Sequence, residues 1–288
     1  MNLTLASIFK AVLQISLLAL TAGTAIAQDV VTLKVHHFLP PSSTAHAKFI
    51  VPWCDKIAKE SNNRMKCQIY PAMQLGGTPA QLFDQAKDGV ADIIWTVPGY
   101  QAGRFTVSEA FELPFIVTST EKGSRALWHY ATKNAMQEFK GVKPILFHLH
   151  DGNLLHTARK QIKSLEDFRG AKVRAATRQS TKMLTALGAT PVPMPLPQTP
   201  ESLAKGVIDG ALIPWEVSPA LKLEEIAQFH TELDPSSGQI SNSVFIFAMN
   251  PAKYNSLPPD LKKVIDANSG PEASAWVGRV FAESGLPG

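Results

Sequence analysis

The sequence predicts an α/β protein with two lobes, and two observations carry that prediction. Predicted helices and strands alternate along almost the whole chain, which is typical of largely parallel sheets covered by helices. One phrase also occurs twice, at 78–95 and 199–215: Thr-Pro-x-x-Leu, then a lysine, Gly-Val-x-Asp and a short apolar run near a tryptophan. A chain of 288 residues is long enough for two such units, each with its own core.

Each predicted element has its own local signal. Short apolar or alternating runs indicate strands, while capping residues and terminal glycines mark the ends of helices. In chain order, we expect a strand at 31–38, a helix at 43–61, a strand and then a turn at 65–77, the first repeat at 78–98, a long helix at 119–139 and extended segments at 142–152 and 154–164. We then expect a strand at 171–176, a helix at 179–187, an extended segment at 189–195, the second repeat at 199–215, a strand at 241–250 and a helical tail.

Both copies of the repeat begin with the same helix-start signal. Thr78 and Thr199 are expected to cap their helices, with the following proline in the first helical position. Gly89 is expected to end the first of these helices. Ser164 and Asp167 predict a further capping box. Each copy therefore reads as a helix that leads into a buried strand.

The repeat and the element order together predict the domain boundaries. We expect residues 28–145 to form the first lobe and residues 146–240 the second, with part of 240–288 returning to the first. No low-complexity linker separates the two halves, so the connections should be structured hinge strands.

The N-terminus predicts export. Residues 1–27 contain Lys10, then an apolar stretch, and end in Ala25-Ile26-Ala27, which fits a signal peptide cleaved after Ala27. The alternative is a membrane anchor, although the stretch is marginal in length for a span and carries polar residues. We therefore expect a soluble, periplasmic mature protein.

The two cysteines, Cys54 and Cys67, leave two alternatives open. In an exported chain they can form a disulfide, and a helix around Cys54 leading into a strand around Cys67 makes that geometry plausible. The other alternative is a pair of buried free thiols.

Charge and motifs argue against several functions. The net charge is +4 with scattered basic residues, so no nucleic-acid partner is expected. The chain has no dinucleotide fingerprint, P-loop, H-E-x-x-H or G-x-S-x-G motif, and no cofactor is expected. His148, His150 and Asp151 leave a metal-dependent hydrolase as an alternative, because two histidines two residues apart on a strand share a face. A polar strand end near a hinge is the reading we favour.

Ligands of open α/β sheets bind beyond the carboxyl ends of the strands. The segments expected there carry an aromatic lining and two guanidinium groups, and the candidate residues are Phe38, Trp95, Tyr100, Arg174, Arg178, Trp215 and Glu216. Arginine suits a carboxylate because its planar fork donates two parallel hydrogen bonds. Arg174 ends an apolar strand, so either an internal acid or a ligand must meet its charge. Trp95 could equally be plain core, and Arg178 a solvated first-turn residue.

In combination, "LKVHHFLPPSS", "SLEDFRGAKVRA" and "DGALIPWEVSP" resemble the solute-binding proteins of tripartite ATP-independent periplasmic (TRAP) transporters, of the DctP type. The resemblance extends over nearly everything after residue 27 and implies a periplasmic binding protein fold with a ligand cleft between two lobes, no enzymatic activity, and membrane permease subunits as partners. We expect a monomer. A receptor for an ATP-driven importer, or a sensor, is the alternative within the binding class.

The resemblance also assigns roles to particular residues. The arginine of the family's G-x-K-x-R motif holds the ligand carboxylate and corresponds to Arg174, while Trp215 and Glu216 supply further contacts. Some members hold a metal ion beside an acid like Glu216, but a second ligand is not clear here, Asn153 being the nearest candidate, and we expect no metal. The second arginine of sialic-acid binders is absent from 151–155. These features favour a monocarboxylate with an apolar or aromatic body. Family members usually continue beyond the point that corresponds to Gly288.

Overall fold

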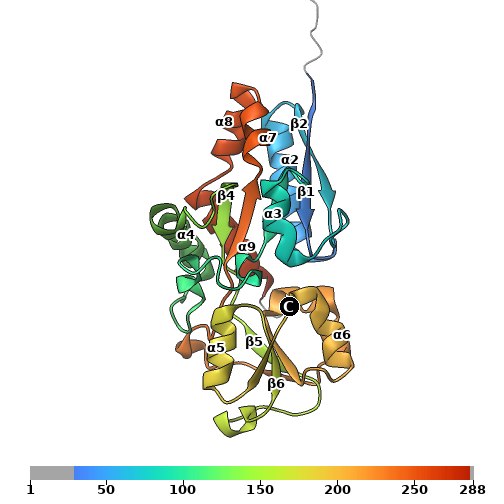
Figure 1. Cartoon of the computed structure of the whole chain (residues 1–288), viewed down its shortest axis with the longest axis vertical. Coiled ribbons are helices and arrows are strands. Elements are labelled where there is room, and N and C mark those ends of the chain that lie inside the picture. Colours follow the sequence, from blue (N-terminus) through green and yellow to red (C-terminus); the bar gives the residue numbers. More distant parts are fainter. Residues whose placement is uncertain (1–28, 286–288) are drawn as a thin grey trace, which may run out of the picture. The chain divides into compact units, whose positions relative to one another are not determined.

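The computed structural model describes residues 29–285, so the predicted signal peptide lies outside the described part. Two five-stranded sheets organise the fold (Figure 1), with the strand orders β2-β1-β3-β10-β4 and β7-β6-β8-β5-β9. We call each sheet, with the helices packed on it, the first and the second lobe. Within residues 29–285, no helix combines the length and the apolar character needed to cross a membrane.

The first sheet combines strands from both ends of the chain. Strand β1 pairs in parallel with β2 and β3, whereas β10 runs antiparallel between β3 and β4. The chain therefore returns to the first sheet after it has built the second. The strands of this lobe are β1 (Val31–His37), β2 (Met65–Tyr70), β3 (Ile93–Thr96), β4 (Lys143–His148) and β10 (Phe245–Met249). Its helices are α2 (Val51–Glu60), α3 (Leu82–Lys87), α4 (Thr120–Tyr130), α7 (Pro251–Ser256), α8 (Pro259–Ala267) and α9 (Pro271–Ser284).

The second sheet repeats this plan. Strand β6 pairs in parallel with β7 and β8, and β5 runs antiparallel between β8 and β9. Its strands are β5 (Leu154–Thr157), β6 (Lys172–Ala175), β7 (Thr190–Pro193), β8 (Gly210–Ile213) and β9 (Phe229–Thr231), and its helices are α5 (Arg178–Ala186) and α6 (Thr199–Ala204).

The repeated phrase forms the same unit in both lobes. A short helix leads into the central strand, which is β3 in the first sheet and β8 in the second. The aspartate of Gly-Val-x-Asp accepts a hydrogen bond from the neighbouring strand: Asp92 from the Lys34 N–H and Asp209 from the Lys172 N–H, each at 2.8 Å. The glycine of each copy has a positive φ, which glycine adopts without strain. This aspartate thus fastens the strand that leads to the site.

Three helix predictions need correction. Thr199 does not cap α6 but begins it, because a 3₁₀ turn at Leu196–Gln198 already opens the segment. The long helix expected at 119–139 ends as α4 at Tyr130 and passes into a π-helical turn. The helix expected at 43–61 is split into a π-helical segment and α2, with Pro52 in the first turn of α2, where it cannot donate a backbone hydrogen bond.

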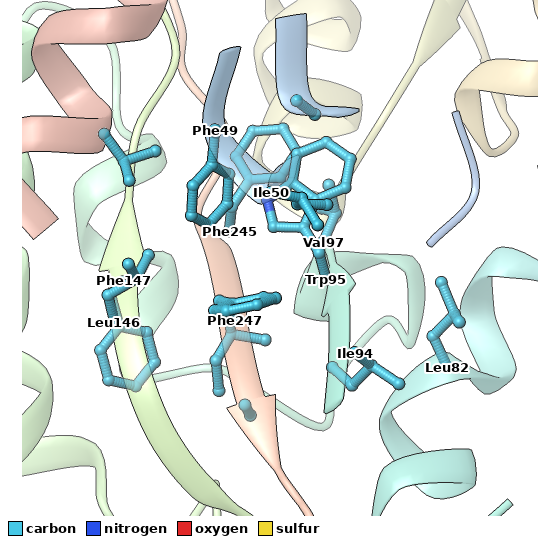
Figure 2. Close-up of a cluster of buried hydrophobic side chains, with 14 of the residues drawn as sticks. Phe49, Ile50, Leu82, Ile94, Trp95, Val97, Leu146, Phe147, Phe245 and Phe247 are labelled. Carbon is cyan, nitrogen blue, oxygen red and sulfur yellow. The ribbon is translucent and has the colours of Figure 1, made fainter. Parts of the chain in front are cut away.

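The first lobe holds the larger hydrophobic core. Figure 2 shows Trp95 of β3, Phe245 and Phe247 of β10, and Phe147 of β4 on neighbouring strands. A disulfide joins Cys54 of α2 to Cys67 of β2, so the first of the two alternatives for the cysteines is the one the structure adopts.

Candidate ligand-binding site

A small cavity, with about 30 Å³ of free space, opens where strand ends from both sheets meet. The first lobe lines it with Phe38, Leu39, Trp95, Val97, Tyr100, Ser243 and Phe245. The second lobe contributes Arg174, Ala176, Leu196, Pro214, Glu216 and Val217, and the segment that joins β4 to β5 adds His150 and Asn153. The lining is mostly apolar, with a few polar groups.

The first lobe supplies an aromatic wall. Trp95 is 1% exposed, and its ring stacks on Phe38 and Phe245 with centroids 4.9 Å and 4.8 Å away. The indole N–H of Trp95 donates a hydrogen bond to Nε2 of His148 at 2.8 Å. Tyr100 adds an edge-to-face contact with Phe38. Figure 2 shows Trp95 and Phe245 on the neighbouring strands β3 and β10, and these ring contacts fix the position of Trp95 in the wall.

The second lobe supplies a buried cation. Arg174 ends an apolar strand and is 3% exposed. Its Nε donates to the Met194 carbonyl at 3.1 Å and its Nη1 to the Leu212 carbonyl at 3.0 Å. Burial lowers the pKa of Arg174, and the neighbouring Tyr100 hydroxyl raises it in partial compensation. Within residues 29–285 its hydrogen-bond partners are neutral and no carboxylate pairs with it. A buried guanidinium without a counter-ion favours an anion in the cavity.

Glu216 is the second ionisable group in the lining. It lies in the 3₁₀ turn Trp215–Val217 that follows β8 and is 8% exposed. Burial, helped by the negative charge of Asp151, raises the pKa of Glu216 to about 8. No group in the described part of the chain donates a hydrogen bond to its carboxyl. At neutral pH this side chain is therefore a buried, uncharged carboxylic acid.

His148 and His150, the two histidines of the hydrolase alternative, lie in different environments. His148 is turned into the core and accepts the hydrogen bond from Trp95. His150 lines the cavity, and its Nδ1–H donates to the Asp151 carbonyl at 2.7 Å. Burial lowers the pKa of His150 to about 4, with Arg174 acting in the same direction, so the ring is neutral. The described residues contain no group of three or more His, Cys, Asp or Glu side chains suited to a metal ion.

Six of the eight predicted ligand-binding residues line this cavity: Phe38, Trp95, Tyr100, Asn153, Arg174 and Glu216. Trp215 does not, because its ring packs against His156 and His230 and its N–H donates to the Glu232 carboxylate. The 3₁₀ turn presents the residues on either side of Trp215 to the cavity instead.

Arg178 also stands outside the cavity lining. Its guanidinium donates to the buried Glu109 carboxylate of the first lobe, with Nε 3.0 Å from the oxygen. Glu109 is 2% exposed, so this partner holds Arg178 away from a ligand role in the cavity.

Several lining residues had no signal in the sequence. Ser243 and Phe245 belong to the returning segment, which the sequence predicted as a crossing but not as part of the wall. Leu39, Val97, Leu196 and Val217 are apolar residues just beyond predicted strands or turns. These four residues follow the carboxyl ends of β1, β3, β7 and β8, so their position in the chain indicated the cavity although their residue types did not.

Comparison with known proteins places the chain. The profile of bacterial extracellular solute-binding proteins, family 7 (DctP), matches residues 35–283. A TRAP solute-binding protein from Rhodoferax ferrireducens T118, solved with copurified benzoate, is 52% identical with a TM-score of 0.87, over 88% of this chain and 79% of that one. A marine metagenome TRAP protein specific for aromatic acid ligands, solved with 3-hydroxybenzoate, is 46% identical with a TM-score of 0.88, over 90% and 81%.

Proteins of lower sequence identity also match most of the chain. A TRAP protein from Bordetella bronchiseptica with bound mandelate is 27% identical with a TM-score of 0.82, over 88% of this chain and 80% of that one. The outer membrane transporter protein TsaT of Comamonas testosteroni is 23% identical, over 83% of this chain and 70% of its own. Because the profile spans most of the chain and its members bind solutes, the hydrolase alternative is set aside. The chain belongs to the DctP family of TRAP solute-binding proteins, with their two-lobed α/β fold.

Proposed function

We propose that this protein captures a small aromatic monocarboxylate in the periplasm and delivers it to a TRAP membrane permease. The observation that carries the proposal is the Arg174 guanidinium, which is buried in the cavity wall with carbonyl and hydroxyl partners and no internal carboxylate. A ligand carboxylate would complete its hydrogen bonds and neutralise its charge.

The lining supports an aromatic body for that ligand. Phe38, Trp95 and Phe245 contribute stacked rings, and among residues 29–285 no second arginine lines the cavity. The two similar structures that are 52% and 46% identical hold benzoate and 3-hydroxybenzoate. A single buried cation beside an aromatic wall suits one carboxylate on one ring.

The energies are compatible with useful affinity. A micromolar dissociation constant corresponds to about 8 kcal/mol. Hydrogen bonds to a charged group contribute about 1.5–3 kcal/mol each, and burial of the ring adds about 25 cal/mol per Å², less the ordering cost. The ring must therefore supply much of the binding free energy, which makes the aromatic wall as important as Arg174.

The proposal also covers the localisation of the protein, its oligomeric state and its partners. Cleavage after Ala27 would release the mature protein into the periplasm as a monomer, with no nucleic-acid partner and no metal or other cofactor. Binding of the ligand between the lobes would stabilise their closed arrangement, which the permease would recognise.

Isothermal titration calorimetry of the mature protein with benzoate and hydroxybenzoates tests the proposal. We expect micromolar or tighter binding of at least one aromatic acid, and at least about a hundredfold weaker binding in Arg174→Ala, as expected on loss of two charge-assisted hydrogen bonds. Arg174→Lys keeps the charge but not the fork and should weaken binding at least about tenfold.

Arg104→Ala is the matched control, because Arg104 pairs with Asp84 inside the first lobe. It should bind like the wild type. Unchanged affinity in folded Arg174→Ala, or no aromatic acid bound by the wild type, would overturn the proposal.

A further inference from the structure

The cavity contains more polar groups than a carboxylate requires. Arg174 is the natural partner for the carboxylate, yet the same cavity is lined by the Glu216 carboxyl and the His150 ring. Glu216 is 8% exposed and has no hydrogen-bond donor among residues 29–285. The Glu216 carboxyl lines the cavity, so a ligand that displaces water from it has to supply a hydrogen-bond partner in its place.

We propose that Glu216 binds a hydroxyl group of the ligand, so that the preferred ligands are hydroxylated aromatic acids and not unsubstituted ones. This inference rests on the proposed function and sharpens it from a class of acids to a substituent. The hydroxyl would be the ligand's second polar group, and Glu216 would be the residue that selects it.

The protonation state of Glu216 suits a hydroxyl partner. Because burial and Asp151 raise the pKa of Glu216 to about 8, the side chain keeps its proton at neutral pH. A protonated carboxyl donates one hydrogen bond and accepts others, and a hydroxyl group does the same. An uncharged Glu216 also avoids repulsion with the carboxylate that Arg174 binds.

His150 offers an acceptor in the lining of the same cavity. Its Nδ1–H is used by the Asp151 carbonyl at 2.7 Å, which leaves Nε2 as the lone-pair nitrogen of a neutral ring. Among the described residues no protein group donates to Nε2. A ligand hydroxyl that donates to Nε2 of His150 and accepts from the protonated Glu216 carboxyl would satisfy both.

The same residue could instead bind the ligand carboxylate together with Arg174. The two arrangements make different predictions, because only the first depends on the ligand hydroxyl. The two similar structures do not decide between them, since one holds benzoate and the other 3-hydroxybenzoate.

A calorimetric comparison of ligands and variants separates these arrangements. The ligands are benzoate, its three monohydroxy isomers and mandelate, and the proteins are wild type, Glu216→Met and Glu216→Gln. We expect at least one hydroxylated acid to bind the wild type about tenfold or more tightly than benzoate, since a site built for a hydroxyl discriminates against its absence.

Glu216→Met should erase this preference by weakening the hydroxylated acid, while benzoate stays within about twofold of its wild-type affinity. Glu216→Gln, which still donates and accepts, should keep most of the preference. Glu224→Met, at an exposed glutamate of the same lobe, is the control and should behave like the wild type.

Two results would overturn the inference. One is benzoate binding to the wild type as tightly as every hydroxylated acid, a measurement that needs no variant. The other is an equal loss for benzoate and the hydroxylated acid in Glu216→Met, which would assign Glu216 to the carboxylate. In either case binding that still depends on Arg174 would leave the proposed function intact.

Discussion

The two lobes share one structural unit but contribute different chemistry to the cavity. In each lobe, the repeat aspartate accepts a hydrogen bond from a backbone N–H of the neighbouring strand. Asp92 accepts from Lys34 of β1, and Asp209 accepts from Lys172 of β6. Counted from those lysines, Phe38 and Ala176 occupy equivalent positions, and both line the cavity. The common unit thus delivers equivalent strand ends to one place, and the residue types there decide what each lobe supplies.

The differences fall at specific equivalent positions. Arg174 corresponds to His36, which is bound by Gln85 inside the first lobe, and Glu216 corresponds to Gly99. A side chain at Gly99 would collide with Thr177 of the second lobe, because an added Cβ would lie 2.7 Å from its Cγ2. The first lobe therefore provides the apolar wall and the second provides the cation and the buried acid. Under the proposed function, the ligand carboxylate would therefore lie on the second lobe.

The largest expected effect tests the buried acid of the second lobe. The raised pKa of Glu216, about 8, means that the folded protein keeps a proton that the unfolded chain releases above its ordinary pKa of 4.5. Stability should therefore fall as pH rises from about 4.5 to about 8, by at most about 1.4 kcal/mol per pH unit. Glu216→Gln removes this dependence, so its stability relative to wild type should increase with pH across that window.

Urea unfolding of both proteins at several pH values between about 5 and 8 measures this difference. Glu224→Gln serves as the control, because its side chain is exposed. Parallel pH profiles for wild type and Glu216→Gln would contradict the raised pKa.

The next effect tests a covalent difference between the lobes. Only the first lobe has a disulfide, between Cys54 and Cys67, and a loop of this length is stabilised by about 3 kcal/mol. Reduction of the wild type, or a Cys54→Ser and Cys67→Ser double variant, should lower the free energy of unfolding by about that amount. Ligand affinity should change little, since neither cysteine lines the cavity. An unfolding midpoint that is insensitive to reduction would contradict this assignment.

A third prediction compares the two repeat aspartates directly. Asp92 is 8% exposed, so Asp92→Ala would leave the partly buried Lys34 N–H without its acceptor, at a cost of about 1–3 kcal/mol. Asp209 is exposed, and water can replace it, so Asp209→Ala should cost less than about 1 kcal/mol. Chemical denaturation of the two variants gives the comparison. Equal losses, or a larger loss at Asp209, would mean that burial does not control the contribution of this bond.

The smallest expected effect concerns the contact between the lobes. Arg178 of the second lobe and Glu109 of the first form an ion pair that requires the lobes to be together. Arg178→Ala should weaken ligand binding at most about fivefold, although Arg178 does not line the cavity, because its side chain is 34% exposed and Gln179 still donates a hydrogen bond to the buried Glu109 carboxylate. Calorimetry with the same ligands measures this, with Arg104→Ala as control. Tighter binding in Arg178→Ala would show that the pair does not favour closure.

The sequence predicted the parts of this molecule that depend on local patterns. The repeat, the parallel strands and the position of Arg174 at a strand end all follow from short-range signals, and the structure shows each of them. Thr78 caps its turn as predicted, with Gln81 completing the box. These features depend on residues that are neighbours in the chain or in one strand–helix unit.

The positions of several site residues could not be predicted, because they depend on contacts between distant segments or on the exact place of a residue along a strand. The two tryptophans of the repeat looked equivalent, but Trp95 corresponds to Leu212 by its distance from the repeat aspartate, and Trp215 lies beyond the end of β8. Phe245 reaches the wall only because β10 inserts between β3 and β4. Arg178 meets Glu109 across the lobes, a partner that no local pattern could reveal.

The most direct test of the central claim is a crystal structure of the protein with a bound aromatic acid. We predict that the ligand carboxylate lies within about 3 Å of the Arg174 guanidinium and that the ligand ring contacts Trp95 and Phe38. A ligand whose carboxylate is bound elsewhere, with Arg174 contacting only carbonyl groups and water, would contradict it.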